Sequence, residues 1–201
     1  KEYSTNEHYQ ISDEKYPVVF EYADQDVAIV HILVNDGVPI ENDLIRGSVL
    51  GKKVEEDGYG IGGALFGLFR PEETTFTEET ALLTAESNVI GVFGFFNVPY
   101  GDWIVRELKP APAFVLNETL YPVTISEQEE TIEITAENRY ITGAVQTTKV
   151  DAAYPGNKLS GAVFEVYVDV DGNREFDAAI DRPAGKLAET EPGIYRLDGL
   201  R

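Results

Sequence analysis

The feature that most constrains the fold of this chain is an internal repeat. Residues 47–55 (GSVLGKKVE) match residues 143–151 (GAVQTTKVD), so that Lys53 corresponds to Lys149 at an offset of 149 − 53 = 96 residues. The same offset relates Asn42 to Asn138. Self-similarity at a fixed spacing is typical of tandem copies of one structural unit.

A second set of matches runs at an offset of 105 residues. It pairs Glu2 with Glu107, Tyr9 with Phe114, and residues 16–18 (YPV) with 121–123 (YPV). Together the two offsets predict a unit of about 96 residues present in one complete and two partial copies. We expect residues 1–46 to be the C-terminal half of a unit, 47–142 a complete unit, and 143–201 the N-terminal half of a third.

The apolar residues within the unit alternate with period two, which predicts β-strands. Ala64, Phe66 and Leu68 share one face, and their counterparts Ala162, Phe164 and Val166 are apolar as well. Glu165 stands where the first copy has Gly67, which predicts solvent on the opposite face. Short strands separated by Gly, Pro, Asn and Asp favour an all-β fold of tandem prealbumin-like or Ig-like sandwiches, with at most one helical turn within 72–87.

Composition excludes several classes of function. The 201 residues include 16 Lys+Arg and 36 Asp+Glu, a formal net charge of −20, which disfavours nucleic acids and anionic membranes as partners. No apolar run approaches the roughly 20 residues that span a membrane. The chain has no Cys, which removes disulfides and thiolate chemistry. It also lacks Met and begins at Lys1, so we expect a segment of a longer polypeptide.

Three polar residues lie on strand faces that are otherwise apolar. Lys53 shares a face with Val49, Glu107 follows Trp103 and Val105, and Asn138 continues the face of Ile132, Ile134 and Ala136. Burying each of these groups costs several kcal/mol unless they satisfy one another. The spacing alone leaves open a buried salt bridge with an Asn hydrogen bond, strand ends that open to solvent, or a chemical role.

The unit resembles the Cna-B/SpaA-type (prealbumin-like) repeat of Gram-positive surface proteins and pilins. Its opening resembles the family's G-x-V-x-x-x-K-V-D strand, which a G-A-x-F-x-L/V-Y strand follows. Residues 103–114 (WIVRELKPAPAF) resemble the family's E-box, Y-x-L-x-E-T-x-A-P-x-G-Y, although Leu108 stands in place of Thr. The unit then closes on a strand that ends in Asn138.

The resemblance implies an autocatalytic isopeptide bond from Lys53 to Asn138, with Glu107 as the proton shuttle. The partial units would carry the equivalent positions Glu2, Asn42 and Lys149. It further implies a structural stalk repeat of a cell-surface or cell-wall-anchored adhesin or pilin, with neighbouring repeats as partners and no activity on external substrates. The alternative is an adhesin module whose loops bind a host matrix protein or glycan.

Two further motifs concern cofactors. Residues 58–63 (GYGIGG) fit G-x-G-x-x-G, but the strand pattern that follows argues against a dinucleotide site, and we expect no cofactor. Residues 169–177 resemble the start of a Ca²⁺ loop, yet Arg174 replaces the usual Gly and Ile180 the bidentate acid. The sequence predicts weak Ca²⁺ binding at best, or a solvated acidic turn. The candidate ligands are Asp169, Asp171, Asn173, Glu175 and Asp177. His8 and His31 are the only histidines and G-x-S-x-G is absent, so a hydrolytic triad has no support.

Overall fold

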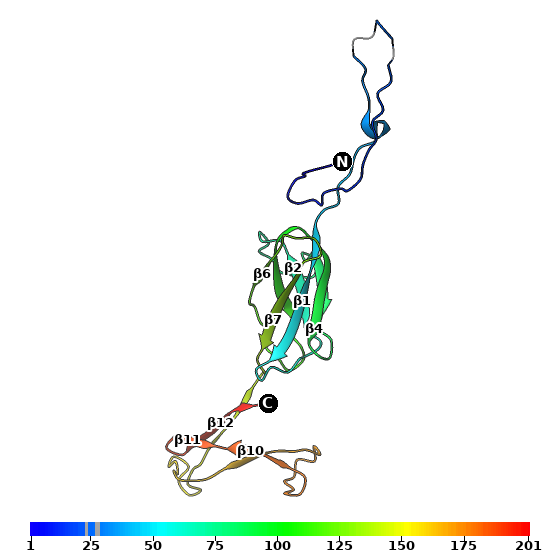
Figure 1. Cartoon of the computed structure of the whole chain (residues 1–201). Helices are drawn as coiled ribbons and strands as arrows, with labels where there is room; N and C mark the ends of the chain where they lie inside the picture. The colour runs from blue at the N-terminus through cyan, green and yellow to red at the C-terminus, as the bar shows by residue number, and fades with distance from the viewer. Residues whose placement is uncertain (23, 27–28) are drawn as a thin grey trace. The chain divides into compact units, whose positions relative to one another are not determined.

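The computed structural model describes residues 1–22, 24–26 and 29–201, which form two compact units, Lys1–Arg139 and Tyr140–Arg201 (Figure 1). The regular structure of the described residues is β, apart from the short η1 (Val34–Gly37), where Asn35 and Asp36 have left-handed backbone angles. None of the described helical structure is long and apolar enough to cross a membrane.

A two-sheet sandwich occupies residues 46–139 of the first unit. One sheet has the order β4-β1-β7, and the other has the order β3-β2-β5-β6. The strands are β1 (Arg46–Glu55), β2 (Leu65–Phe69), β3 (Leu83–Glu86), β4 (Val92–Pro99), β5 (Gly101–Lys109), β6 (Tyr121–Ile125) and β7 (Thr131–Asn138). The predicted all-β sandwich is confirmed.

The first and last strands of this sandwich are parallel neighbours. In their register Lys53 lies opposite Ala136 and Glu55 opposite Asn138, whereas β1 pairs antiparallel with β4 on its other side. Parallel strands need a long connection, and here the connection is the remainder of the sandwich. The chain therefore enters the sheet at the start of β1 and leaves it at the far end of β7.

The predicted inward face of β2 forms the centre of the core. Ala64, Phe66 and Leu68 are fully buried, and the Phe66 ring stacks on Phe93 with the ring centroids 3.9 Å apart. Gly51 makes room for this stack, because a Cβ there would lie 2.0 Å from Phe93 Cζ.

The predicted solvent on the other face of β2 is wrong for the complete sandwich. The Phe69 ring covers Gly67, and Phe69 is itself fully buried with Phe76 edge-on against it. Phe76 belongs to the 70–82 connection, which folds back over this face. Within 72–87 one hydrogen bond from Ala81 N to Thr77 O closes a single turn, and residues 83–86 form β3, a strand that the pattern did not predict.

Residues 1–45 contain an isolated bridge between Tyr9 and Leu44 and no named strand among those described. They contact the sandwich at Tyr100, whose ring stacks on His8 at 4.3 Å and whose backbone N donates to Ile45 O at 2.9 Å.

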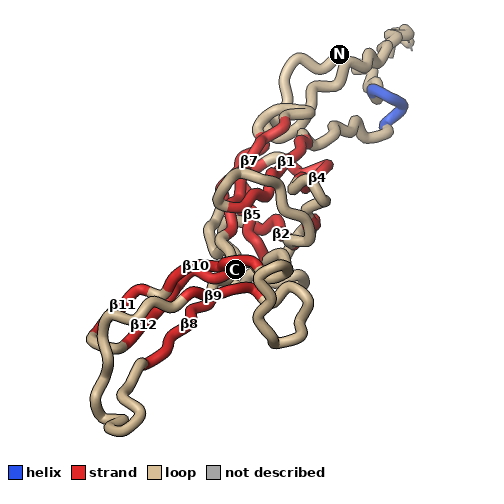
Figure 2. Tube along the Cα trace, turned by 90° about the horizontal axis from the view of Figure 1, so that it is seen from below, coloured by secondary structure: helices blue, strands red, loops and turns tan. Residues whose placement is uncertain are grey.

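The second unit contains a three-stranded sheet of order β11-β12-β8 and the pair β10-β9 (Figure 2). Its strands are β8 (Gly143–Thr148), β9 (Glu165–Val168), β10 (Arg182–Lys186), β11 (Ala188–Glu191) and β12 (Ile194–Leu200). The division into one complete and two partial repeats, at 1–46, 47–142 and 143–201, stays a prediction.

Candidate functional site

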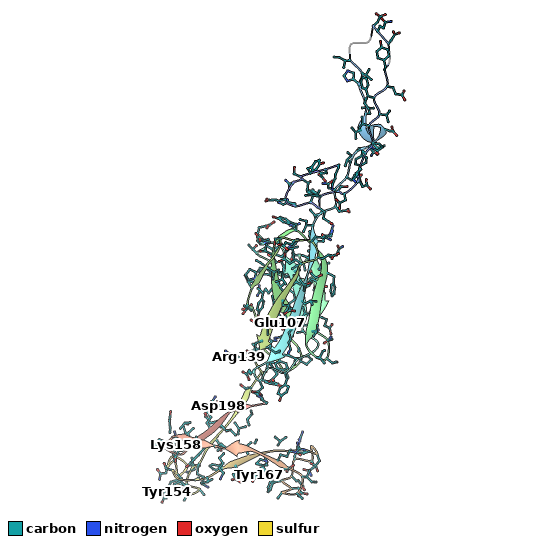
Figure 3. The ribbon with its side chains drawn as sticks, in the orientation of Figure 1. Glu107, Arg139, Tyr154, Lys158, Tyr167 and Asp198 are labelled. Carbon is teal, nitrogen blue, oxygen red and sulfur yellow. The ribbon has the colours of Figure 1, made fainter. Side chains whose placement is uncertain are left out.

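Three polar side chains that the sequence singled out meet inside the sandwich. Lys53 comes from β1, Asn138 from the end of the neighbouring β7, and Glu107 (labelled in Figure 3) from β5 in the opposite sheet. The exposed fraction of each residue is 1% or less. Lys52, one residue before Lys53, is exposed, as strand alternation requires.

The Glu107 carboxylate is the centre of this group. Asn138 Nδ2 donates to Glu107 Oε1 at 2.9 Å, and Lys53 Nζ lies 4.0 Å from the same oxygen. Lys53 Nζ also donates to the backbone oxygen of Ala136 at 3.0 Å, directly across the β1–β7 register. The amine, the acid and the amide therefore lie within one enclosed space.

Burial shifts both ionisable groups toward their neutral forms. Desolvation lowers the pKa of Lys53 from 10.5 to about 8, against the opposing attraction of Glu107 and Glu137. Desolvation also raises the pKa of Glu107, although the Asn117 backbone hydrogen bond, Lys53 and Asn138 each act in the opposite direction. A free amine and a protonated acid are thus both more accessible here than in water.

The amide of Asn138 is only half satisfied. Its Oδ1 is the one buried side-chain oxygen or nitrogen without a hydrogen-bond partner among the described residues. The two ends of an amide have nearly the same shape, so a half-turn of the group would aim Oδ1 at Glu107. A protonated Glu107 could then donate to that oxygen and polarise the carbonyl carbon.

Sequence reasoning missed one residue that positions this acid. Asn117 N donates to Glu107 Oε2 at 2.7 Å, while its side chain donates to Tyr121 Oη at 3.1 Å and Glu137 O at 2.7 Å. Asn117 lies outside the strands and outside the E-box. The 105-residue offset relates Asn117 to Ser12, whose backbone N donates to Glu2, the equivalent of Glu107.

A comparison with known protein families finds a match for the residues that form the sandwich. Residues 47–140 match the family model described as the SpaA prealbumin-like fold domain. The match covers 140 − 47 + 1 = 94 of the 201 residues, and we call this segment the SpaA-type domain because it is similar to that family. No curated protein matches the chain.

Solved structures that are similar to this chain include the TIE protein and two pilins. The TIE protein of Bacillus anthracis is 22% identical with a TM-score of 0.61, covering 80% of this chain and 28% of its own. BcpA, the major pilin subunit of Bacillus cereus, is 23% identical with a TM-score of 0.41, covering 50% of this chain and 32% of its own. The minor pilin GBS52 of Streptococcus agalactiae is 20% identical with a TM-score of 0.40, covering 50% and 48%. The present chain thus spans less than half of each of these proteins.

Outside the SpaA-type domain, the equivalent positions are divided between the two compact units. Glu2 and Asn42 are in contact with each other, with Asn42 Nδ2 donating to Glu2 Oε1 at 2.9 Å. Lys149 lies in the second unit, beyond the end of β8.

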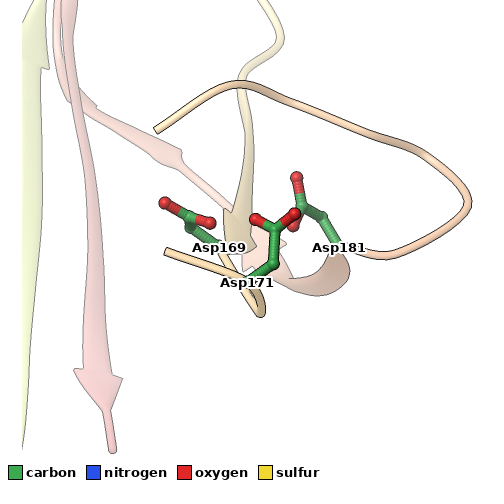
Figure 4. Close-up of side chains that lie close together, drawn as sticks. All are labelled: Asp169, Asp171 and Asp181. Carbon is green, nitrogen blue, oxygen red and sulfur yellow. The ribbon is translucent and has the colours of Figure 1, made fainter. Parts of the chain in front are cut away.

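The acidic turn of the second unit gathers a different set of carboxylates from the predicted one. Oxygens of Asp169, Asp171 and Asp181 all lie within 4.8 Å of one another (Figure 4), and the group does not include Glu175 or Asp177. The Asp169 oxygens accept hydrogen bonds from Gly172 N and Arg174 N, and those of Asp181 from Val170 N and Asp177 N. These bonds stabilise the turn itself, and Ca²⁺ binding stays a prediction.

The glycine-rich 58–63 segment leads into a connection and then into β2. A dinucleotide fingerprint requires a helix at that point, and the strand predicted there is confirmed. The expected absence of a cofactor stays a prediction.

Proposed function

We propose that the SpaA-type domain is a covalently cross-linked spacer in a stalk on the surface of a Gram-positive bacterium, as part of an adhesin or pilin. The observation that carries this proposal is the buried contact of Lys53 and Asn138 with one carboxyl group, Glu107. Neighbouring repeats of the same protein are its partners. The chemistry is a single intramolecular event and not turnover of an external substrate.

The bond would form by attack of the neutral Lys53 amine on the Asn138 side-chain carbonyl carbon. Glu107, initially protonated, donates to the carbonyl oxygen, takes a proton from the attacking amine, and passes one to the departing nitrogen. One amide bond forms, one breaks, and ammonia leaves. Enclosure of the reacting groups supplies the proximity that the step needs.

The position of the bond suits a load-bearing spacer. The chain enters at the start of β1 and leaves after Asn138, so tension would run along β1 to Lys53, across the bond, and out of the domain. The residues between Lys53 and Asn138 would carry no load. A protein without Cys gains from this a cross-link that no reductant opens.

The alternative, a loop that binds a host ligand, has less support. The 70–90 connection contains one aromatic residue, Phe76, and that ring packs against Phe69 and under the Arg106 guanidinium at 4.7 Å. An aromatic platform for a glycan would need a ring with a free face.

Intact mass spectrometry under denaturing conditions tests the cross-link. We expect the wild-type SpaA-type domain to have lost one ammonia, with a peptide joining Lys53 to Asn138 after digestion. Lys53→Arg should retain the full mass, whereas the matched exposed variant Lys52→Arg should lose ammonia as the wild type does. A wild-type domain that has lost no ammonia would refute the proposal.

A further inference from the structure

The carboxyl group of Glu107 is held by a segment that lies outside the strands. Its Oε1 faces the other two polar groups of the core, with Asn138 Nδ2 at 2.9 Å and Lys53 Nζ at 4.0 Å. Its Oε2 accepts a hydrogen bond from Asn117 N at 2.7 Å. Asn117 belongs to the connection between β5 and β6, so the orientation of the acid depends on where this connection lies.

The Asn117 side chain ties this connection to two strands. Its Nδ2 donates to Glu137 O on β7 at 2.7 Å and to Tyr121 Oη on β6 at 3.1 Å. Its Oδ1 accepts a hydrogen bond from Thr119 N at 2.9 Å, so both ends of the amide are bound. Because the Asn side chain is short, these bonds also restrict the backbone N–H that holds Glu107.

An ion pair on the outer face of the β3-β2-β5-β6 sheet holds the same connection. Arg106 Nη2 donates to Glu118 Oε1 at 3.0 Å, and Glu118 is the residue after Asn117. The Arg106 guanidinium also lies over the Phe76 ring at 4.7 Å. Arg106 precedes Glu107 on β5, and strand alternation directs their side chains to opposite faces of the sheet. The outer ion pair and the inner acid are therefore joined through neighbouring residues.

The hydrogen bond from Asn117 decides which oxygen of a protonated Glu107 carries the proton. A protonated carboxyl group has one O–H donor and one carbonyl oxygen, and a backbone N–H pairs best with the carbonyl oxygen. With Oε2 as that carbonyl oxygen, the proton lies on Oε1, which faces Asn138 and Lys53. Without this bond, the proton is free to lie on either oxygen, and the carboxyl group is free to turn away from the amide.

We propose that Asn117 and Glu118 are positioning residues for the acid of the core. The Arg106–Glu118 ion pair and the Asn117 side chain hold the Asn117 N–H at Oε2 of the acid, which keeps the acid's proton on Oε1. The inference rests on the proposed function, because this orientation matters only if Glu107 transfers protons. It adds that an ion pair on the outer face controls the rate of bond formation. The Glu118 side chain is 74% exposed, so salt should weaken the pair and slow the reaction.

The time course of ammonia loss after cell-free synthesis of the full chain tests this control. Glu118→Ala removes the ion pair, and because exposed pairs contribute little, we expect ammonia loss to slow about two- to fivefold at low salt. At about 1 M salt the wild-type rate should approach that of the variant, whose own rate should change little. Glu133→Ala is the matched control, because Glu133 is exposed on β7, and it should follow the wild type at both salt concentrations.

A second variant tests the role of Asn117 itself. Asn117→Ala keeps the backbone N–H but removes the side-chain bonds to β6 and β7, so the N–H is no longer fixed at Glu107. We expect ammonia loss in this variant to slow about ten- to a hundredfold, the cost of a misplaced reacting group.

An NMR titration of Glu107 separates positioning from a loosened core. It uses the full chain with Asn138→Ala, which cannot form the bond. Burial raises the pKa of Glu107 and the Asn117 N–H lowers it, so adding Asn117→Ala should raise this pKa further. Water entering a loosened core would lower the pKa instead. The titratable groups that interact with Glu107 are Lys53 on β1 and Tyr121 on β6, and both are unchanged in the comparison.

The possible results are distinguishable. Slower ammonia loss in Glu118→Ala and Asn117→Ala, with a raised Glu107 pKa in the latter, supports the inference. Wild-type rates in both variants, equal slowing of the wild type and Glu118→Ala by salt, or a lowered Glu107 pKa would overturn it and leave the proposed function intact. A wild type that loses no ammonia would refute the proposed function and the positioning role together.

Discussion

Replacing Glu107 by Gln removes the proton shuttle and keeps the shape of the side chain. Glu107 is buried and contacts both partners of the expected bond, so Gln should fold in its place yet neither accept nor release the protons of the reaction. We expect a folded domain in which Lys53 and Asn138 remain separate.

The loss of stability follows from the loop that the bond closes. Lys53 and Asn138 are 138 − 53 = 85 residues apart. If the chain-entropy relation for disulfides transfers, closing such a loop stabilises the fold by about 4.5 kcal/mol at 25 °C. For a domain of this size, that loss should lower the melting temperature by roughly 20 to 30 °C.

Calorimetry of wild type and Glu107→Gln, with the intact mass of each sample, measures this effect. Glu133→Gln is the matched control, because Glu133 lies on β7 with its side chain exposed. The control should lose ammonia and melt as the wild type does. The reasoning fails if Glu107→Gln loses ammonia normally, or if it melts with the wild type despite lacking the bond.

Three further predictions concern the ionisation, packing and metal binding of the chain. In Asn138→Ala the amine of Lys53 stays free, and because its pKa is lowered in the folded state, the unfolded state binds the proton more tightly. The free energy of unfolding, measured in urea, should therefore rise by up to about 3 kcal/mol between pH 8 and 10.5. A flat profile would contradict this. Gly51→Ala should cost about 1–3 kcal/mol in chemical denaturation, because the new methyl group meets the Phe93 ring, and unchanged stability would count against that packing. Calorimetry should detect at most weak Ca²⁺ binding, confined to 169–181 and abolished by Asp169→Asn, and submicromolar affinity or an ion bound within 47–142 would show this to be wrong.

The sequence alone determined the class of fold and the polar residues that enter the core. Alternation along β2 and β5 assigns Phe66 and Glu107 to the interior, since strand geometry sends every second side chain to one face. The same rule separates Lys53 from Lys52. The repeat offsets pair Glu2 with Glu107 and so indicate a second acid from the sequence alone.

Local patterns failed where the tertiary structure brings distant segments over a strand. The outer face of β2 should have met water, but Phe69 and Phe76 cover it because the 70–82 connection folds back. The alternation of residues along a strand does not predict where the following connection will pack. The local pattern also missed part of the acidic turn. The expected Ca²⁺ ligands lie within 169–177, whereas the carboxylate group includes Asp181, which comes later in the chain.

The family resemblance implied that Lys53, Glu107 and Asn138 meet, but the physical reason for their meeting lies in the tertiary structure. Periodicity assigns each side chain to a face, but not which strands are neighbours or in what register they pair. The parallel register of β1 and β7 places Lys53 opposite Ala136, two residues before Asn138, and the packing of the second sheet brings Glu107 within 4.0 Å of the amine. A shift of one residue in that register would turn Asn138 to the opposite face of the sheet, because side chains alternate with a period of two.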